Sequence, residues 1–354
     1  MTITAPTSGV EDAITSPLLR VEGLTTELVL DDVRVRAVDD LSFTIAAGET
    51  LGVVGESGCG KSMMALSLLG LAPNPPAIVS AGVAHFDGVD LLALDPAGLR
   101  RLRGNRIAMI FQEPMTAFNP LMSIGSQIAE VCRRHLGHSP AQAKARAIEL
   151  LERVRIPDAK ARALDYPHQL SGGMRQRAMI AMALSCDPVL LIADEPTTAL
   201  DVTIQAQVLE LISDLREETG MAMLLITHDL GVIAEMADRV LVMYAGRKVE
   251  EAPVVELFGR SAHPYTSGLM ASVPKLGSSL FEDVTALKEI PGRVPAPAEL
   301  PAGCAFAPRC ALADDRCRVE RPELREISAK HETACWHPNQ WDIAASNRTA
   351  GSNV

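Results

Sequence analysis

The chain has 354 residues, of which 47% are hydrophobic and 22% are charged, so its composition predicts a folded protein and excludes wholesale disorder. This length favours two domains, or one large domain with an appendage. Acidic residues outnumber lysine and arginine by 44 to 33, and the resulting net charge of −11 opposes non-specific binding to nucleic acids.

The two ends of the chain are expected to be disordered. Residues 1–17 hold no basic residue and no apolar run, so they do not resemble a secretory signal and are interpreted as a disordered arm of a cytoplasmic protein. Residues 346–354 are interpreted as a disordered tail. No stretch reaches the roughly 18 consecutive apolar residues that a spanning helix needs, so we expect any membrane association to go through a partner.

The first part of the chain predicts an antiparallel layer of strands and then a strand–loop–helix unit. Residues 18–53 contain short stretches rich in Val and Leu, separated by acidic turns, and these predict an antiparallel layer. An apolar strand at 51–54 runs into a glycine-rich loop, and an amphipathic helix is expected over 61–71. Asp95 and Pro96 predict the start of another helix, before a strand at 106–111.

The middle of the chain predicts a helical insert and then an alternating pattern. The insert lies between Gln112 and Leu170 and includes a periodic helix over 141–155, which begins after Ser139. Helices of this kind between apolar strands predict a parallel sheet covered on both faces. The expected order after the insert is strand 189–193, helix 202–219, strand 222–226, helix 229–237 and strand 240–243.

The C-terminal part differs in composition. Prolines and glycines multiply from residue 272, and we place a domain boundary near residue 275. The remaining segment has too little periodic apolar content for a large core of its own, so it is expected to need a staple. Four cysteines crowd into it, and in a cytoplasmic chain such clustering indicates metal rather than disulfides. They are Cys304, Cys310, Cys317 and Cys335.

The spacing of these four cysteines leaves three interpretations open. Most zinc sites use tight C-x₂₋₄-C pairs, which this segment lacks, so a structural [4Fe–4S] cluster is favoured over Zn²⁺. Plain reduced thiols are the third possibility. His337 is a candidate ligand, whereas Trp336 is expected to pack the lobe.

A phosphate-binding loop is the most specific motif. Residues 55–62 fit the pattern G-x-x-x-x-G-K-[ST] in full, between an expected strand and an expected helix, so a chance glycine turn is disfavoured. Its amides are expected to enclose the β-phosphate, Lys61 to contact the β- and γ-phosphates, and Ser62 to bind Mg²⁺. The loop consists of Gly55, Glu56, Ser57, Gly58, Cys59, Gly60, Lys61 and Ser62.

A buried strand that ends in two carboxylates predicts the rest of a hydrolytic site. Asp194 is expected to hold Mg²⁺ and Glu195 to act as the general base for an attacking water, although an acidic helix cap would look the same. Gln112 follows another expected strand and could reach Mg²⁺ and the water. His228 follows a third strand and is expected to contact the γ-phosphate.

Three further segments resemble motifs of ATP-binding-cassette (ABC) ATPases. Residues 170–177, Leu-Ser-Gly-Gly-Met-Arg-Gln-Arg, resemble the signature motif, residues 198–201 the D-loop and residues 227–229 the switch histidine. With the phosphate loop and the carboxylate strand they follow the order of that family, and the resemblance covers residues 18–260.

The resemblance implies an α/β fold and a composite site. The fold comprises a RecA-like P-loop core, an antiparallel β subdomain and a helical subdomain at about 113–175, all within an ABC ATPase domain at 18–274, followed by a small Cys-rich C-terminal lobe at 275–345. Two cassettes would face head to tail around two ATP molecules, and hydrolysis to ADP and phosphate would open the pair. The residues implied to bind a nucleotide held by the partner are Ser171, Gly172, Gly173 and Asp201.

One feature departs from the family. ABC ATPases often stack adenine on an aromatic residue before the glycine loop, whereas this chain has Val-Arg-Val-Arg at 33–36. We therefore expect Arg34 or Arg36 to stack on the base.

Details of three segments resemble the ATPase subunits of oligopeptide and dipeptide importers. These are residues 174–184, 201–207 and 263–266, and they favour the D-type subunit, whose signature has Met after two glycines and which carries a C-terminal cysteine extension. The resemblance implies a heterodimer with a homologous second ATPase at the cytoplasmic face of the membrane. Two transmembrane permease subunits would bind the helical insert, and an extracytoplasmic substrate-binding protein would feed them.

Other functions remain open at this point. The cargo could be a dipeptide, an oligopeptide, glutathione or a nickel complex. A soluble cassette ATPase that acts on nucleic acid or ribosomes is disfavoured by the net charge and because no long coiled-coil insertion or second cassette is evident. A regulator in which the cysteines sense iron or oxidants is disfavoured by the intact set of hydrolytic residues.

Overall fold

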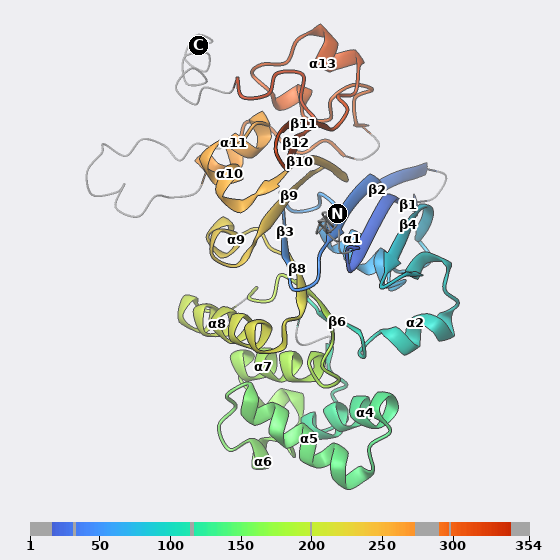
Figure 1. Cartoon of the computed structure of the whole chain (residues 1–354), viewed down its shortest axis with the longest axis vertical. Coiled ribbons are helices and arrows are strands. Elements are labelled where there is room, and N and C mark those ends of the chain that lie inside the picture. The colour runs from blue at the N-terminus through green and yellow to red at the C-terminus, as the bar shows by residue number, and fades with distance from the viewer. Residues whose placement is uncertain are drawn as a thin grey trace, which may run out of the picture.

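The computed structural model describes residues 16–30, 33–113, 117–198, 200–272, 290–296 and 299–340. Three levels follow one another along the long axis of the molecule: the C-terminal region at the top, a mixed α/β core in the middle and a group of helices at the bottom (Figure 1). The expected N-terminal arm lies outside the described residues except for residues 16 and 17. The expected C-terminal tail and the expected domain boundary near residue 275 also lie outside them. Within the described ranges, no helix has the length and apolar character needed to cross a membrane.

The core is an eight-stranded sheet with strand order β11-β12-β10-β9-β3-β8-β7-β6. The five strands from β9 to β6 pair in parallel. Strands β3, β7 and β8 are buried along their whole lengths, because helices lie on both sides of them, and this explains their continuous apolar sequences. The expected parallel sheet is therefore confirmed. Its parallel strands are β3 (Thr50–Val54), β6 (Ile107–Ile110), β7 (Leu190–Asp194), β8 (Ala222–Ile226) and β9 (Arg239–Tyr244).

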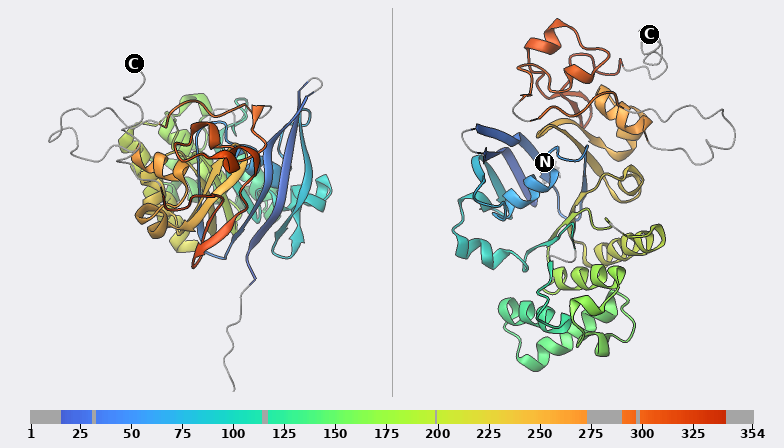
Figure 2. Two further views of the ribbon diagram at one scale, coloured as in Figure 1. Left: turned by 90° about the horizontal axis from the view of Figure 1, so that it is seen from above. Right: turned by 180° about the vertical axis from the view of Figure 1, so that it is seen from behind.

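A separate four-stranded antiparallel sheet stands beside this core, with strand order β2-β1-β4-β5 (Figure 2). The expected antiparallel layer is confirmed, but β1 and β2 are not short: they have 12 and 13 residues and pair from Leu19↔Ile45 to Leu30↔Val33. Helix α1 packs Met64 and Leu68 into the apolar core that the two sheets share. The strands are β1 (Leu19–Leu30), β2 (Val33–Ile45), β4 (Ala77–Phe86) and β5 (Val89–Asp90).

The helices begin where the sequence places cap residues. The Asp95 carboxylate accepts a hydrogen bond from the backbone N of Gly98 (2.6 Å), and Ser139 forms a capping box with Gln142. The insert is helical as expected and forms the lower level of the molecule. The helices up to this point are α1 (Lys61–Leu68), η1 (Leu91–Ala93), α2 (Pro96–Leu102), α4 (Ile124–Leu136), α5 (Pro140–Arg153), α6 (Ala159–Arg162), η2 (Pro167–Gln169) and α7 (Gly172–Ala183).

The C-terminal region is joined to the α/β core through both backbone and side chains. Strand β12 pairs antiparallel with β10, so the main sheet continues into this region. Phe306 packs against Tyr244 at 5.3 Å between ring centroids, and Tyr244 packs against Tyr265 at 4.7 Å. A segment with little apolar content of its own is thus stabilised by the core of the α/β region. The remaining elements are α8 (Val202–Thr219), α9 (Leu230–Met236), β10 (Arg247–Pro253), α10 (Val254–Gly259), α11 (Pro264–Ala271), η4 (Ala307–Arg309), α13 (Asp315–Val319), β11 (Arg325–Ser328) and β12 (His331–Thr333).

Candidate active site

The phosphate loop connects the end of β3 to the start of α1. Two of its glycines are required by close backbone approach and by positive φ: a Cβ at Gly55 (φ 153°) would lie 2.2 Å from the Met243 carbonyl oxygen, and a Cβ at Gly60 (φ 101°) would lie 2.3 Å from the Ala37 carbonyl oxygen. No side chain fits at either position. The backbone of the loop is therefore held against β2 and β9, with the amino end of α1 directly after it.

Lys61 folds back over this loop. Its ammonium group donates hydrogen bonds to the carbonyl oxygens of Gly55 (2.6 Å) and Glu56 (3.1 Å), and the residue is only 6% exposed. The Cys59 sulfur lies 3.7 Å from the same nitrogen, but burial raises the pKa of this thiol, so it stays protonated at neutral pH. Lys61 is thus a fixed positive charge at the entrance to α1, as phosphate binding requires.

Ser62 and Asp194 form the candidate magnesium site. The Ser62 hydroxyl donates to Asp194 Oδ1 at 3.0 Å, and Asp194 is 4% exposed at the end of β7. Burial raises the pKa of Asp194, and the hydrogen bond from Ser62 opposes that shift only in part. A hydroxyl and a buried carboxylate are hard oxygen donors of the kind that Mg²⁺ prefers, and a cation would offset the desolvation of the carboxylate. The residues therefore fit this ion.

Glu195 lies at the centre of a hydrogen-bonded group. Its carboxylate accepts from Gln112 Nε2 (3.0 Å) and Thr198 Oγ1 (2.7 Å), and its other oxygen lies 3.2 Å from His228 Nδ1. Although burial raises the pKa of Glu195, the hydrogen bonds from Thr198 and His228 outweigh burial and lower it below the usual value. Glu195 is therefore ionised at neutral pH and can accept a proton from water.

The parallel sheet explains why these side chains meet. Gln112, Glu195 and His228 follow the carboxyl ends of β6, β7 and β8, which lie at the same edge of the sheet as the phosphate loop after β3. The structure thus brings together all the hydrolytic residues that the sequence predicted within one chain. It adds Thr198, which the sequence marked only as part of a D-loop; the signal was a hydroxyl three residues after the carboxylate.

The signature residues lie on a different surface. Ser171 caps α7, its hydroxyl accepting from the backbone N of Met174 (3.3 Å), and both Ser171 and Gly172 are exposed. Gly173 is closely packed, since a Cβ there would lie 2.8 Å from Ile204 Cγ2. Asp201 is exposed and caps α8. Among the described residues, no hydrogen bond links this group to the phosphate loop, so its role in a partner's site stays a prediction.

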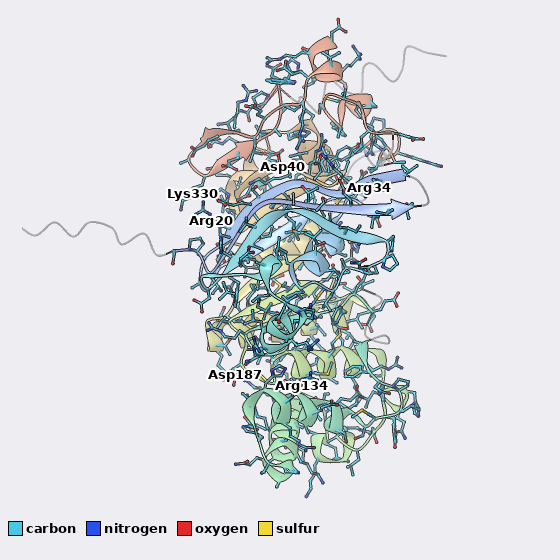
Figure 3. The ribbon with its side chains drawn as sticks, turned by 90° about the vertical axis from the view of Figure 1, so that its right-hand side faces the viewer. Arg20, Arg34, Asp40, Arg134, Asp187 and Lys330 are labelled. Carbon is cyan, nitrogen blue, oxygen red and sulfur yellow. The ribbon has the colours of Figure 1, made fainter. Side chains whose placement is uncertain are left out.

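The two arginines expected near the adenine base are held by acidic neighbours. Arg34 lies toward one end of the β1–β2 pair (Figure 3), and its guanidinium group is 3.5 Å from Glu27. Arg36 pairs with Asp39 at 3.0 Å. Both are more than half exposed, so stacking on a base remains a prediction.

The four clustered cysteines line one small cavity, together with Phe306 and Trp336. As expected, Trp336 packs the lobe: the guanidinium carbons of Arg316 and Arg325 lie 3.4 Å and 4.9 Å from the centre of its ring. Burial raises the pKa of Cys310 to about 11 and that of Cys335 to about 12, so without a metal these thiols are neutral at pH 7.

Potential metal ligands approach one another closely beside Cys317. Among the described residues, Asp314, Cys317 and His337 form a group of potential metal ligands. Their ligand atoms all lie within 4.8 Å of one another. His337 also donates its backbone N to the Cys335 sulfur at 3.3 Å. The four thiols line one cavity, and the metal or cluster that they would hold stays a prediction.

Two family models match the chain. The model described as ABC transporter covers residues 38–198, and the model described as oligopeptide/dipeptide transporter, C-terminal region, covers residues 249–317. The first match contains the phosphate loop, the signature motif and the carboxylate pair. The second contains three of the four clustered cysteines.

Whole-chain relatives agree with these matches. The chain is 51% identical over 326 residues to a putative peptide import ATP-binding protein of Brucella abortus, covering 90% of this chain and 96% of the relative. It is 52% identical over 323 residues to a probable peptide ABC transporter ATP-binding protein of Sinorhizobium fredii, covering 91% and 96%.

Solved structures give the same fold. A dimeric post-hydrolysis state of the ATP-binding cassette MJ0796 bound to ADP and Pi has a TM-score of 0.60 and 26% identity, and the match covers 67% of this chain and 98% of that one. The cbiO1 protein of Clostridium perfringens, part of the ABC transporter complex cbiONQ, has a TM-score of 0.58 and 26% identity, covering 69% and 91%. The chain therefore belongs to the ATPases of the ATP-binding-cassette transporter family and carries the oligopeptide/dipeptide transporter C-terminal region.

Proposed function

We propose that this ATPase is the motor subunit of a membrane importer for di- or oligopeptides. One observation carries the proposal. The same chain has the residues expected for ATP hydrolysis and a C-terminal region of the oligopeptide/dipeptide transporter type. The names of the relatives, peptide import and peptide ABC transporter ATP-binding proteins, support the same cargo class.

The geometry supports a direct route for hydrolysis. The amides of the phosphate loop and Lys61 bind the triphosphate, while Ser62, Asp194 and Gln112 would hold Mg²⁺, which when bound offsets the charge of the phosphate oxygens. Glu195 accepts a proton from the water whose oxygen bonds to the γ-phosphorus as the bond to the bridging oxygen of ADP breaks. His228, at 3.2 Å from Glu195, orients that carboxylate and the γ-phosphate.

We propose that a second cassette completes this site. Ser171, Gly172 and Asp201 are exposed at or beside helix amino ends, where a facing subunit's γ-phosphate would be bound. The partner is a homologous ATPase subunit. We expect the permease contact on the helical insert, where Leu121 and Leu164 are 84% and 65% exposed. Two permease subunits and an extracytoplasmic binding protein would place this chain at the cytoplasmic face of the membrane.

Transport assays test the proposed cargo. Cells that lack this chain are expected to lose uptake of labelled di- and oligopeptides, and the native chain should restore it. Ser171→Arg should not restore uptake, because a bulky charge at the start of α7 blocks the facing nucleotide. Uptake of nickel or glutathione that depends on this chain, with peptide uptake unchanged, would replace the proposed cargo.

We propose that Cys304, Cys310, Cys317 and Cys335 hold a structural [4Fe–4S] cluster. When bound, such a cluster supplies a covalent cross-link between the loops of a lobe that has little apolar core. The four thiols line one shared cavity, which supports a common site for them.

Anaerobic purification tests the cluster. The native protein should show a broad absorption shoulder near about 400 nm and about four iron atoms per chain. Cys310→Ser should lose both, whereas Cys186→Ser, a buried cysteine of the cassette, should keep them. A colourless protein with one zinc ion would assign the site to zinc instead.

A further inference from the structure

The second residue of the phosphate loop is bound from outside the cassette. Glu56 forms a two-pronged ion pair with Arg309 of the C-terminal region, with Nη1 to Oε2 at 2.6 Å and Nη2 to Oε1 at 3.0 Å. The Arg309 side chain is only 4% exposed and that of Glu56 is 28% exposed. Paired planar groups of this kind fix orientation as well as distance.

Arg309 is itself held firmly. Its Nε donates to the carbonyl oxygen of Pro291 (2.8 Å) and its Nη2 to that of Ile290 (3.3 Å). The guanidinium carbon lies 5.9 Å from the ring centres of both Tyr244 and Phe306. The position of the guanidinium group is thus determined by the C-terminal region and the aromatic core, and Glu56 is the only acidic side chain that the described structure pairs with it.

A second contact holds the backbone of the same residue. The Tyr265 hydroxyl accepts a hydrogen bond from the backbone N of Glu56 at 2.8 Å, and Tyr265 is fully buried in α11. Since Lys61 donates to the Glu56 carbonyl oxygen, a displacement of Glu56 would also move a partner of the phosphate-binding lysine.

Arg309 also belongs to the chain segment between two of the clustered cysteines. It ends the short helix η4, between Cys304 and Cys310. The backbone of this segment is joined to that of a third cysteine, since the N of Cys304 donates to the Cys317 carbonyl oxygen at 2.8 Å. A displacement of this segment would therefore also move the Arg309 side chain, which contacts Glu56.

We infer that Arg309 is a positioning residue for the phosphate loop, through which the cysteine-bearing C-terminal region sets the affinity for ATP. Without Arg309, the half-buried Glu56 carboxylate loses its counter-charge beside the place where a triphosphate binds, and the loop loses an anchor. Both effects weaken ATP binding. The link to the cysteines rests on the proposed metal site, whereas the Arg309–Glu56 contact does not.

The test compares full-length variants in MgATP binding and in steady-state hydrolysis. Arg309→Met should raise both Kd and KM for ATP about tenfold, the scale expected for a lost charge-assisted contact, and should change kcat less. Arg309→Lys should recover part of the affinity. Glu56→Gln combined with Arg309→Met should bind ATP more tightly than Arg309→Met alone, because the unpaired charge is gone. Tyr265→Phe removes only the second contact and should weaken binding less.

The control is Arg318→Met, which removes an exposed arginine of the same region that pairs with Asp315. It should leave Kd and KM unchanged. If Arg309→Met lowers the melting temperature but binds ATP like the native chain, Arg309 is only structural and the inference is overturned. If Glu56→Gln gives no recovery in the Arg309→Met chain, the electrostatic part is overturned.

A cysteine variant tests the link to the metal site. Cys310→Ser should weaken ATP binding in the native background and add little in the Arg309→Met background, because both act through one contact. Iron content is measured on the same samples, so that a chain without iron refutes the proposed cluster independently of the Arg309 result. Unchanged ATP affinity in an iron-depleted Cys310→Ser chain would overturn the link to the cysteines.

Discussion

Replacing Glu195 by glutamine is expected to abolish ATP hydrolysis while ATP stays bound. The amide keeps the shape of the side chain but cannot accept a proton from water, and general-base catalysis of this kind typically contributes about 10²–10⁴-fold to kcat. Since the phosphate loop and Ser62 are untouched, the affinity for ATP should not fall. Bound, uncleaved ATP should accumulate, with the two facing cassettes held closed.

The measurement combines phosphate release with the molar mass in solution at saturating MgATP. Glu210→Gln is a matched control, because Glu210 is an exposed glutamate on α8. This variant should hydrolyse ATP at the native rate. A Glu195→Gln chain that turns over as fast as the native one would remove Glu195 from the role of base. Thr198 and Gln112, which share its carboxylate, would then be examined as holders of the water.

Replacing Lys61 by alanine should have the largest effect on nucleotide binding. Lys61 is the buried cation of the phosphate loop, and a hydrogen bond to a charged group contributes about 1.5–3 kcal/mol, so the Kd for ATP should rise at least roughly tenfold and up to roughly 100-fold. The loss should be much smaller for adenosine, which has no phosphate for Lys61 to contact.

Lys160→Ala, at an exposed position in α6, is the control for loss of one positive charge and should bind ATP normally. Because Lys61 also bonds two loop carbonyls, a melting curve must show that the variant is folded. Native affinity in a folded Lys61→Ala chain would contradict the assignment of this loop to phosphate binding.

Local signals explain which elements could be predicted. Helix α8 and strand β8 have the predicted bounds. For the helix, Asp201 caps the start and Gly220 ends it in the left-handed conformation. Strands β4 and β5 were not predicted, because β4 is largely exposed along its middle and has no continuous apolar run. Strand β12 has only three residues and is defined by its pairing with β10 and β11.

In the candidate site, too, some residues could be predicted from local signals and others could not. Gln112, Glu195 and His228 could be predicted because each follows a recognisable strand, and parallel strands bring their carboxyl ends to one edge. Thr198 was not predicted as a partner of Glu195, because a hydroxyl three residues after a carboxylate is a weak signal: a hydroxyl in a turn has many possible partners. The Arg309–Glu56 pair joins residues 253 positions apart, and no local pattern marks either residue for the other.

By itself, the sequence determined the motifs, their order along the chain and the family resemblance, because these depend on residue type, periodicity and short spacing. Tertiary structure alone decided that the C-terminal region extends the main sheet, shares its aromatic core and contacts the phosphate loop through Arg309, while Tyr265 of α11 binds the same loop residue. The physical reason is that such contacts depend on the path of the backbone through space, where one arginine is placed by two carbonyl oxygens and two rings from separate segments.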